Sequence, residues 1–254
     1  MLDLQVQVEL LERVRNVSTV KAFSLVCQQI TQNLGCDFYL FRLFRPAETT
    51  QLQLFLDSNY PKQWLENYLY NCSYDPIFRL CRDYCRPIFW HELKQQQPTN
   101  SLSEQFFQEI AKFGIIDGIS VAVRGILGEF GILSLSMKRL IEPAEKLNLQ
   151  LQSQLFVPYL HEAVNRFWRQ SQMDYGLSPR ERECLSWASQ GKTTWEIAQI
   201  LKLAESTVNY HLNNTLSKTQ SSNRQQAIVK ALMSGLLMMD FVAKPTVSHV
   251  TNDD

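Results

Sequence analysis

A row of polar side chains near the C-terminal end of the chain has the types and spacing needed to read DNA bases. Thr207, Asn209, Tyr210 and Asn213 fall in Glu205–Thr219, which the pattern predicts to be a helix, and they lie off its apolar face. Asn209 and Asn213 are one helical turn apart, and an asparagine side chain pairs with adenine through two hydrogen bonds. The same residues would also serve as plain solvated positions, so the pattern favours base reading but leaves that alternative open.

The charges around this helix supply only weak attraction for phosphates. Between residues 175 and 240, seven lysines and arginines stand against five acidic residues, and seven minus five gives a net charge of +2. Lys192 and Lys218 are the basic residues that we expect to contact the DNA backbone. So small a charge predicts weak binding by one module, and a dimer that holds two half-sites at once would overcome it.

Other combinations of reactive side chains are missing from the sequence. Six cysteines are present, but no C-x-x-C pair occurs and none of the four histidines is spaced beside them as a metal ligand. We therefore expect ordinary buried thiols, with no metal and no cofactor. No G-x-S-x-G motif, glycine-rich phosphate loop or paired-carboxylate motif occurs, so the sequence does not predict an enzyme.

The composition is that of a globular protein with no overall charge. Lysine plus arginine and aspartate plus glutamate each number 25 in 254 residues, and 45% of the residues are apolar. No uncharged run reaches the roughly 20 residues of a membrane-spanning helix, and the first residues lack the pattern of a secretory signal. We expect a cytoplasmic protein without membrane contact, in which any nucleic-acid surface is local.

The first two-thirds of the chain combines helices with strands that do not alternate one by one. Apolar residues recurring at three and four predict the helices, which are two between Val6 and Leu34, one from Pro61, one from Asp75-Pro76, one over Ser101–Phe113 and a long one over Glu142–Trp168. The predicted strands are Phe38–Phe44, Leu52–Leu56, Ile119–Arg124 and Gly131–Lys138. Pro158 should kink the long helix. This order predicts an α+β fold, an α/β/α sandwich with an antiparallel sheet.

After residue 173 the pattern changes to short helices alone. The predicted helices are Pro179–Gln190, Thr194–Leu201, Glu205–Thr219 and Arg224–Leu237. Ser178 with Glu181, and Thr193 with Glu196, have the spacing of capping boxes, which marks two of the starts. Two short helices joined across Lys202–Ala204 are typical of a helix-turn-helix domain that is entirely helical. The predicted division is a domain at 1–168, a linker at 169–175, a DNA-binding domain at 176–241 and a frayed tail at 242–254.

The C-terminal helices resemble the DNA-binding domain of LuxR-type transcription factors. The matching stretches are Leu177–Leu185, Gly191-Lys-Thr, Glu196-Ile-Ala, Thr207–Leu212 and Ser222-Asn-Arg224 followed by Ala227. The resemblance covers nearly the whole helical domain, and it is specific because many positions agree in order and spacing. One departure is Ala204, where the family usually has a serine before the recognition helix, and losing such a cap typically costs about 1 kcal/mol.

The N-terminal domain resembles the signal-binding domain of acyl-homoserine-lactone receptors. The matching residues are Asn59–Pro61, Trp64, Tyr68, Asp75-Pro76, Pro87–Trp90, Phe113-Gly114, Gly118 and Gly131–Ser136. With both domains, the chain resembles a quorum-sensing regulator. The resemblance implies that a signal ligand contacts Trp64, Tyr68, Asp75 and Trp90, together with Tyr60 and Ser134.

The chemistry of an acyl-homoserine lactone agrees with these side chains. Its buried amide and carbonyl groups need partners, because an unpaired group costs roughly 1–3 kcal/mol. The Asp75 carboxylate would accept a hydrogen bond from the amide N–H, and the Trp64 indole would donate one to the ring carbonyl. The hydroxyl groups of Tyr60 and Ser134 would donate hydrogen bonds to the acyl carbonyl. The rings of Tyr68 and Trp90 would form flat apolar walls.

Two departures from the family pattern leave the ligand open. Only Leu69–Tyr74 separate the tyrosine from the aspartate, two residues fewer than usual, and Arg42 stands where many relatives have a small residue. We expect both changes to affect the end of the pocket that holds the acyl tail. Asp75 also suits a simple helix cap, and the aromatic residues suit an ordinary core. The alternative is a regulator of the same fold that responds to another small molecule or to none.

The weak charge of a single DNA-binding module also predicts a homodimer. A two-fold dimer places its recognition helices about one DNA turn apart, roughly 34–36 Å, so the expected target is an inverted repeat. In the last helix, Ile228, Ala231, Leu232 and Gly235 recur at three and four, and we interpret them either as an exposed stripe for self-association or as core. The expected partners are an acyl-homoserine lactone, double-stranded DNA, a second copy of the chain and RNA polymerase.

Overall fold

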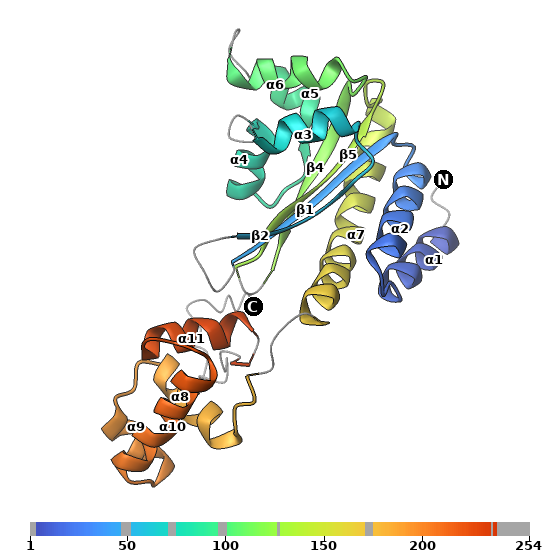
Figure 1. The fold of residues 1–254 in the computed structure, drawn as a ribbon. Helices are drawn as coiled ribbons and strands as arrows, with labels where there is room; N and C mark the ends of the chain where they lie inside the picture. The colour runs from blue at the N-terminus through green and yellow to red at the C-terminus, as the bar shows by residue number, and fades with distance from the viewer. Residues whose placement is uncertain are drawn as a thin grey trace, which may run out of the picture. The chain divides into compact units, whose positions relative to one another are not determined.

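The computed structural model describes residues 4–46, 52–70, 75–95, 101–125, 128–170, 175–234 and 236–237. The chain divides between residues 171 and 172 into two compact units (Figure 1). The tail predicted at 242–254 lies outside the described residues. Within the described ranges, no helix is both long enough and apolar enough to cross a membrane.

The N-terminal unit is built on a five-stranded antiparallel sheet with the strand order β2-β1-β5-β4-β3. Its strands are β1 (Phe38–Pro46), β2 (Leu52–Ser58), β3 (Ile88–Phe89), β4 (Asp117–Arg124) and β5 (Phe130–Met137). In the register of the central pair, Leu40 lies opposite Ser134 and Arg42 lies opposite Ile132. Four of these strands agree with the sequence prediction, and β3 was not predicted.

Helices cover both faces of this sheet (Figure 1). One layer contains α1 (Leu4–Arg15), α2 (Val20–Asn33) and α7 (Pro143–Gln170), and the other contains α3 (Lys62–Tyr70), α4 (Pro76–Asp83), α5 (Trp90–Gln95) and α6 (Leu102–Ala111). Alternate residues of β1 face opposite sides of the sheet. Phe41 and Leu43 pack with α2 and α7. Phe38 and Leu40 pack on the side of α3 to α6. The predicted sandwich with an antiparallel sheet is confirmed.

Side-chain caps fix the starts of several helices in this unit. Thr19 accepts a hydrogen bond from the backbone N–H of Ala22 at the start of α2, and Ser101 accepts one from Glu104 at the start of α6. The long helix α7 continues through Pro158 as one element. The start at Ser101 lies where the sequence predicted it, whereas the cap at Thr19 was not predicted.

The C-terminal unit contains α8 (Pro179–Ser189), α9 (Thr194–Leu201), α10 (Glu205–Lys218) and α11 (Arg224–Met233). Both predicted capping boxes form, at Ser178 with Glu181 and at Thr193 with Glu196. Lys202 adopts the left-handed conformation, with φ 54° and ψ 48°, and so ends α9 and turns the chain into α10. The predicted helix-turn-helix is therefore present.

The apolar residues of α11 belong to the core of their own unit. Ala231 is fully buried, and Ile228 and Leu232 are partly buried against the same core, which also contains Val208. Gly235 lies outside the described residues. The interpretation of these residues as an exposed stripe is therefore wrong, because a small helical unit needs them to cover its own interior.

The cysteines follow the expectation of buried thiols with one exception. Cys27, Cys36, Cys81 and Cys184 are buried, whereas Cys85 is exposed. Burial raises the pKa of the Cys81 thiol to about 12, so that group stays protonated. Cys72 lies outside the described residues.

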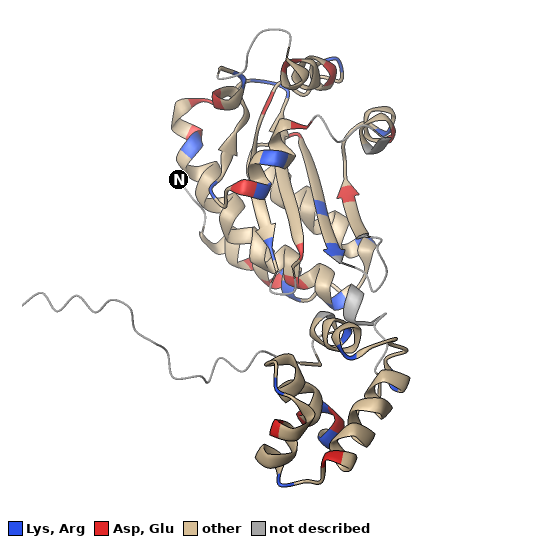
Figure 2. Cartoon of the chain, turned by 90° about the vertical axis from the view of Figure 1, so that its left-hand side faces the viewer, with Lys and Arg blue, Asp and Glu red and all other residues tan. Residues whose placement is uncertain are grey.

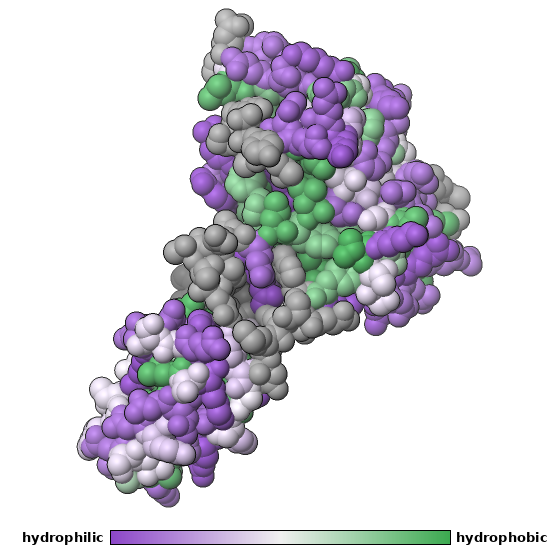
Figure 3. Space-filling view, viewed as in Figure 1, coloured by the Kyte–Doolittle hydropathy of each residue, from purple (hydrophilic) through white to green (hydrophobic). Residues whose placement is uncertain are grey.

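Charged and apolar residues are distributed differently over the surface. Where the residues are described, acidic and basic residues are intermixed along both units (Figure 2). Apolar residues of the N-terminal unit gather over the sheet, beside polar helix surfaces (Figure 3), and Leu54 on the edge strand β2 is 42% exposed. No single charged face therefore marks a binding surface on the described residues, and a site must be found from its local chemistry.

Candidate functional site

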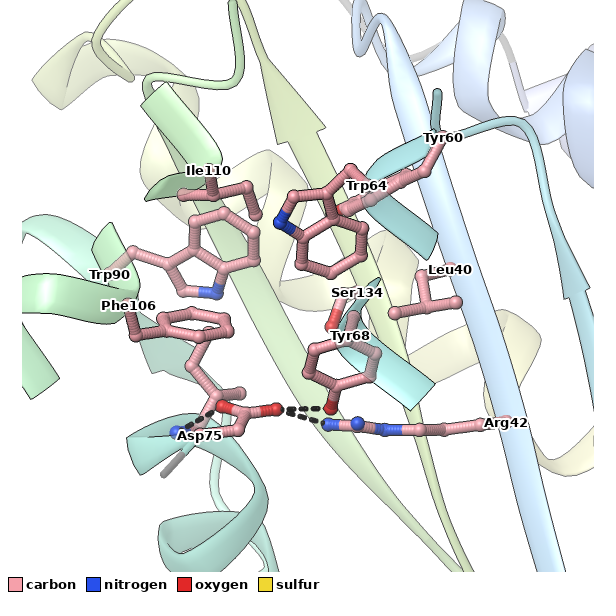
Figure 4. A pocket seen from close by; sticks show the side chains of 11 residues that line it. Leu40, Arg42, Tyr60, Trp64, Tyr68, Asp75, Trp90, Phe106, Ile110 and Ser134 are labelled. Carbon is pink, nitrogen blue, oxygen red and sulfur yellow. Dashed lines mark hydrogen bonds and ion pairs between the residues drawn. The ribbon is translucent and has the colours of Figure 1, made fainter. Parts of the chain in front are cut away.

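A small cavity lies between the sheet and helices α3 to α6 of the N-terminal unit (Figure 4). The residues that line it are Leu40, Arg42, Tyr60, Trp64, Tyr68, Asp75, Ile77, Trp90, Phe106, Ile110 and Ser134. All six residues predicted to contact a ligand are among them. The free space at the centre is about 10 Å³, the room taken by one water molecule. The side chains of the wall therefore fill most of the site themselves.

Asp75 lies just before α4, and both of its carboxylate oxygens are in use. Oδ1 accepts hydrogen bonds from the backbone N–H groups of Ile77, at 2.8 Å, and Phe78, at 3.2 Å, which makes Asp75 the N-cap of α4. Oδ2 accepts hydrogen bonds from the Tyr68 hydroxyl at 2.6 Å and from the Arg42 guanidinium at 2.8 Å. A carboxylate offers about four acceptor positions, so these donors fill it.

Arg42 reaches Asp75 from β1 and forms a buried ion pair with it (Figure 4). Both side chains are 3% exposed. The guanidinium lies over the rings of Tyr68 and Phe78, at 5.2 and 5.0 Å from their centroids. Its Nε is buried and has no hydrogen-bond partner among the described residues. Arg42 thus contacts the residue assigned to the ligand amide, and not the tail end where we expected its effect, because the register of β1 directs it toward the start of α4.

Aromatic rings from α3 form one wall of the cavity. Trp64 and Tyr68 are one helical turn apart and stack at 4.7 Å with an angle of 14° between their planes. The Tyr60 ring lies 5.1 Å from the Trp64 ring. In Figure 4 the Trp64 indole nitrogen points across the cavity toward Ile110 and Trp90, and it donates to none of the described residues. It is a free hydrogen-bond donor at the centre of the site.

The opposite wall contains a chain of hydrogen bonds. Trp90 Nε1 donates to Ser120 Oγ at 2.9 Å, and Ser120 Oγ lies 2.8 Å from Ser134 Oγ. Either hydroxyl can donate in this second bond, and when Ser120 donates, the Ser134 hydroxyl hydrogen is left for the cavity. Gly118 makes room for this arrangement, since a Cβ there would lie 3.0 Å from the Trp90 ring.

The Tyr60 hydroxyl is held by a serine that sequence reasoning missed. Its oxygen lies 2.8 Å from Ser136 Oγ, and burial raises the pKa of Tyr60, so the phenol stays neutral. Ser120 was missed as well. The alternation of side chains along a strand could have identified Ser136, because Ser134 and Ser136 lie on the same face of β5. Ser120 lies beside them because it pairs with Ser134 on the neighbouring strand β4.

In the C-terminal unit, α10 presents the predicted base-reading residues away from the core. Asn209, Tyr210 and Asn213 are exposed and Thr207 is half-buried, whereas Val208 and Leu212 of the same helix are buried. Tyr210 is 62% exposed. Asn209 Oδ1 accepts a hydrogen bond from the Thr194 hydroxyl at 3.4 Å, which connects the recognition helix to α9.

The two lysines predicted to contact phosphates have different surroundings. Lys218 Nζ donates to Glu181 Oε2 at 2.7 Å and to the Gly176 carbonyl at 2.9 Å. Burial opposes ionisation of Glu181, but the hydrogen bonds from Lys218 and Ser178 outweigh it and hold the pKa of Glu181 below its ordinary value. Within the described part of the chain, the Lys192 ammonium has only a long ion pair, 3.6 Å, with Glu196 at the surface. Lys192 is therefore the freer of the two.

Family comparisons identify both units. The model of the family described as "Autoinducer binding domain" matches residues 19–164, and the model described as "Bacterial regulatory proteins, luxR family" matches residues 176–231. The chain is 35% identical to the transcriptional activator protein AhyR of Aeromonas hydrophila, over 91% of each chain. It is 29% identical to the transcriptional activator protein LuxR of Aliivibrio fischeri, over 90% of this chain and 93% of that protein. Such relatives are transcriptional regulators and not enzymes.

Solved structures agree with the fold. The crystal structure of Escherichia coli SdiA is similar with a TM-score of 0.74 and 24% identity, covering 92% of this chain and 99% of that one. The structure described as SdiA in complex with octanoyl-rac-glycerol gives a TM-score of 0.71 and 25% identity, covering 93% and 98%. With both domains matched in order along one chain, this protein belongs to the LuxR family of transcriptional regulators that join an autoinducer-binding domain to a helix-turn-helix domain.

Proposed function

We propose that this protein is a cytoplasmic transcription factor that binds an acyl-homoserine lactone in its N-terminal unit and an inverted-repeat DNA site as a homodimer. The observation that carries the proposal is the cavity beneath α3 to α6, where a free indole N–H, a carboxylate and a serine hydroxyl converge on one space. RNA polymerase is the further partner that we expect, and the proposal requires no cofactor.

The polar groups of the cavity suit an acyl-homoserine lactone. The unpaired indole N–H of Trp64 suits the ring carbonyl, and Asp75 suits the amide N–H. The hydroxyl of Ser134, at the end of the chain from Trp90 and Ser120, suits the acyl carbonyl, with the neutral Tyr60 phenol as a second donor. Tyr68 and Trp90 supply apolar surface for the rest of the molecule. The amide N–H and both carbonyl groups of the ligand would then have partners.

Binding requires the wall of the cavity to open. Ligand pockets commonly measure roughly 300–1,000 Å³, whereas the free space here is about 10 Å³. A ligand that binds the opened arrangement shifts the population toward it. Closure around an apolar ligand therefore couples binding to a change of conformation, which is the kind of event a ligand-controlled regulator needs.

The polar face of α10 supports DNA reading through the major groove. Asn209 and Asn213 are exposed one turn apart, and Thr207 and Tyr210 flank them. Lys192 is the freer phosphate contact, and Lys218 is the second one that we propose. With the weak net charge of the unit, useful affinity depends on holding two half-sites together.

An apolar stripe on α7 supports self-association through the N-terminal unit. Leu147, Leu151 and Leu155 recur at four residues and are 65%, 51% and 38% exposed. A two-fold dimer uses the same surface from both copies, and a continuous apolar stripe on one helix is suited to packing against itself. A dimer of this kind accounts for an inverted repeat as the target.

The decisive experiment has two arms on the full-length protein. The first expresses it with a mixture of acyl-homoserine lactones and identifies the co-purified ligand by mass spectrometry; we expect one lactone at one molecule per chain. The second selects bound DNA from a random pool with that ligand present; we expect an inverted repeat. Recovery of no lactone would contradict the ligand, and full affinity for single half-sites would contradict the dimer.

An acylglycerol is a second candidate ligand. The relative SdiA has been solved with octanoyl-rac-glycerol, a molecule without an amide N–H. In this chain the acceptor positions of Asp75 are filled, so such a ligand would leave the ion pair with Arg42 in place. Stabilisation by octanoyl glycerol, together with no stabilisation by any acyl-homoserine lactone, would favour this alternative.

A further inference from the structure

The acceptor positions of Asp75 are filled, and this constrains how a ligand amide can bind there. Two of its four donors are the backbone N–H groups that begin α4, so they stay as long as the helix does. The Tyr68 hydroxyl is held by the stacking of its ring on Trp64 at 4.7 Å. Arg42 has a long flexible side chain, so it is the donor that can move away from Asp75. An amide N–H therefore reaches Asp75 by displacing Arg42.

Among the described residues, no second acidic side chain pairs with Arg42, so a displaced Arg42 would have no replacement partner for its charge. Its guanidinium lies over the rings of Tyr68 and Phe78, and Phe44 packs on Phe78 with centroids 5.5 Å apart. Among the described residues, Asp75 is its sole ion-pair partner, and its Nε already has no hydrogen-bond partner. Leaving a buried cation unpaired is strongly unfavourable. The ligand itself must therefore supply an acceptor.

The position of that acceptor follows from the ligand's own geometry. In a trans amide the carbonyl oxygen points away from the N–H, so it points away from Asp75 and the neighbouring Arg42. The ring carbonyl is assigned to Trp64 on the other wall. An oxygen on the third carbon of the acyl chain is different, because rotation about the single bonds brings it to the N–H side. A neutral oxygen is favoured over a carboxylate, since a carboxylate would place two anions beside one buried cation.

We propose that Arg42 determines ligand specificity, and that it selects acyl-homoserine lactones with a neutral oxygen on the third carbon of the acyl chain. The inference rests on the proposed function, because it assumes that the ligand amide binds at Asp75. Arg42 donates to that oxygen through Nε or Nη, and the cation over the Tyr68 and Phe78 rings stays paired throughout. A plain acyl chain displaces Arg42 without giving it a partner.

Two ligands that differ by one oxygen test this on the full-length protein. The probes are N-(3-oxooctanoyl)-homoserine lactone and N-octanoyl-homoserine lactone, with dissociation constants measured by calorimetry. We expect the wild-type protein to bind the oxo ligand roughly tenfold to a hundredfold more tightly, the range for one hydrogen bond from a charged donor. Arg42→Met keeps the apolar stem and removes the donors, so the ratio should fall to about one.

Matched variants separate Arg42 from a general loss of charge. Arg139→Met removes a cation that pairs with Glu145 at the surface of the same unit, away from the cavity, and should keep the wild-type ratio. Arg42→Lys keeps the charge but loses the planar fork, so its ratio should lie between those of the wild type and Arg42→Met. An Arg42→Met variant that keeps the full preference would overturn the role of Arg42.

The affinities of the wild-type protein for the two lactones test the inference even if a variant does not fold. Equal affinity for the two lactones would overturn the inference and leave the proposed function standing. Binding of neither lactone would overturn both. A ring-opened probe, N-octanoyl-homoserine, tests the charge of the ligand; tighter binding of this carboxylate than of either lactone would show that Arg42 selects anions and would also overturn the inference.

Discussion

Asp75 and Arg42 illustrate how a single side chain can serve the fold and the ligand together. Asp75 caps α4, holds the Tyr68 hydroxyl and neutralises a buried arginine, and it is also the acceptor proposed for the ligand. Substitution of either partner therefore changes more than recognition. Loss of one member of a buried ion pair is commonly worth about 3–5 kcal/mol, because the other charge is left uncompensated.

We expect Asp75→Asn to weaken ligand response and also to destabilise the N-terminal unit. The double variant Arg42→Met/Asp75→Asn removes both charges and should recover part of the lost stability, even though it still lacks the ligand acceptor. Denaturant titration of the wild type, the two single variants and the double variant measures the coupling. Strictly additive losses in the free energy of unfolding would show that the pair is not coupled.

Lys218 gives a prediction about pH, since it holds the pKa of Glu181 below its ordinary value. A lowered carboxyl pKa adds stability above the ordinary value of 4.5, and this contribution is lost as the pH falls through the lower pKa of the folded state. Lys218→Met should therefore cost about 1 kcal/mol at neutral pH, with the difference from wild type shrinking in acid. Urea unfolding between pH 3 and pH 7 measures it.

The control for this prediction is Lys192→Met, because the contact of Lys192 with Glu196 is long and exposed. Contacts of that kind contribute little to stability. Comparing the two variants therefore separates an effect on the free energy of unfolding from an effect on DNA binding. If Lys218→Met left the unfolding free energy unchanged without DNA but flattened the salt dependence of DNA binding, its main role would be the phosphate contact.

At the scale of elements, the sequence predicted those helices and strands whose ends carry side-chain signals or whose apolar period is long. The capping boxes at Ser178 and Thr193 and the cap at Ser101 allowed helix starts to be placed within a residue. The elements β3 and α5 were missed because a two-residue strand has no period to detect and α5 begins at Trp90 directly after it, without a capping residue.

The candidate site was predictable in composition but not in its internal pairing. Six of its lining residues were identified from the resemblance to the signal-binding domain, and the chemistry of their side chains agreed with that assignment. The Arg42–Asp75 contact joins residues 33 positions apart. It depends on the register of β1 and on how α4 docks beside it, and neither is visible in local sequence. The serine at position 120 was missed for the same reason, since its partners come from β5 and α5.

Helix α10 provides a test of capping at the element scale. Its N-cap is Ala204, which has the extended backbone of a cap, φ −72° and ψ 145°, but makes no side-chain hydrogen bond. We expect Ala204→Ser to stabilise the C-terminal unit by about 1 kcal/mol, because the serine would accept a hydrogen bond from the first turn. Thermal and urea unfolding measure this. Ser178→Ala, at a cap that is already made, should cost a similar amount, and no change in either variant would contradict the argument.

For the whole molecule, the main feature is that the two units have separate interiors. The N-terminal unit has one core on each side of its sheet, and the C-terminal unit has its own core around Ile197 and Val208. A ligand bound beneath α3 to α6 therefore acts directly on one unit. Its influence on DNA binding must pass through the arrangement of the units, through the dimer, or through both.

We expect ligand to raise the unfolding temperature of the N-terminal unit alone. At a free concentration about 100 times the dissociation constant, binding adds roughly 2.7 kcal/mol to the free energy of unfolding. Scanning calorimetry of the full-length protein should show one ligand-dependent transition and one that stays in place. If both transitions moved together, the units would unfold cooperatively, and if neither moved, the ligand would not bind a buried site.

The two indole groups of the cavity also give the site a spectroscopic signature. Trp90 Nε1 already donates to Ser120, whereas the Trp64 indole N–H points into the cavity and donates to none of the described residues. In a nitrogen-15-labelled sample, the Trp64 indole proton should exchange with solvent more readily and move downfield when a carbonyl occupies the site. The Trp90 proton should hardly shift. A single magnetic resonance titration would thus report both occupancy of the cavity and which wall the ligand's carbonyl faces.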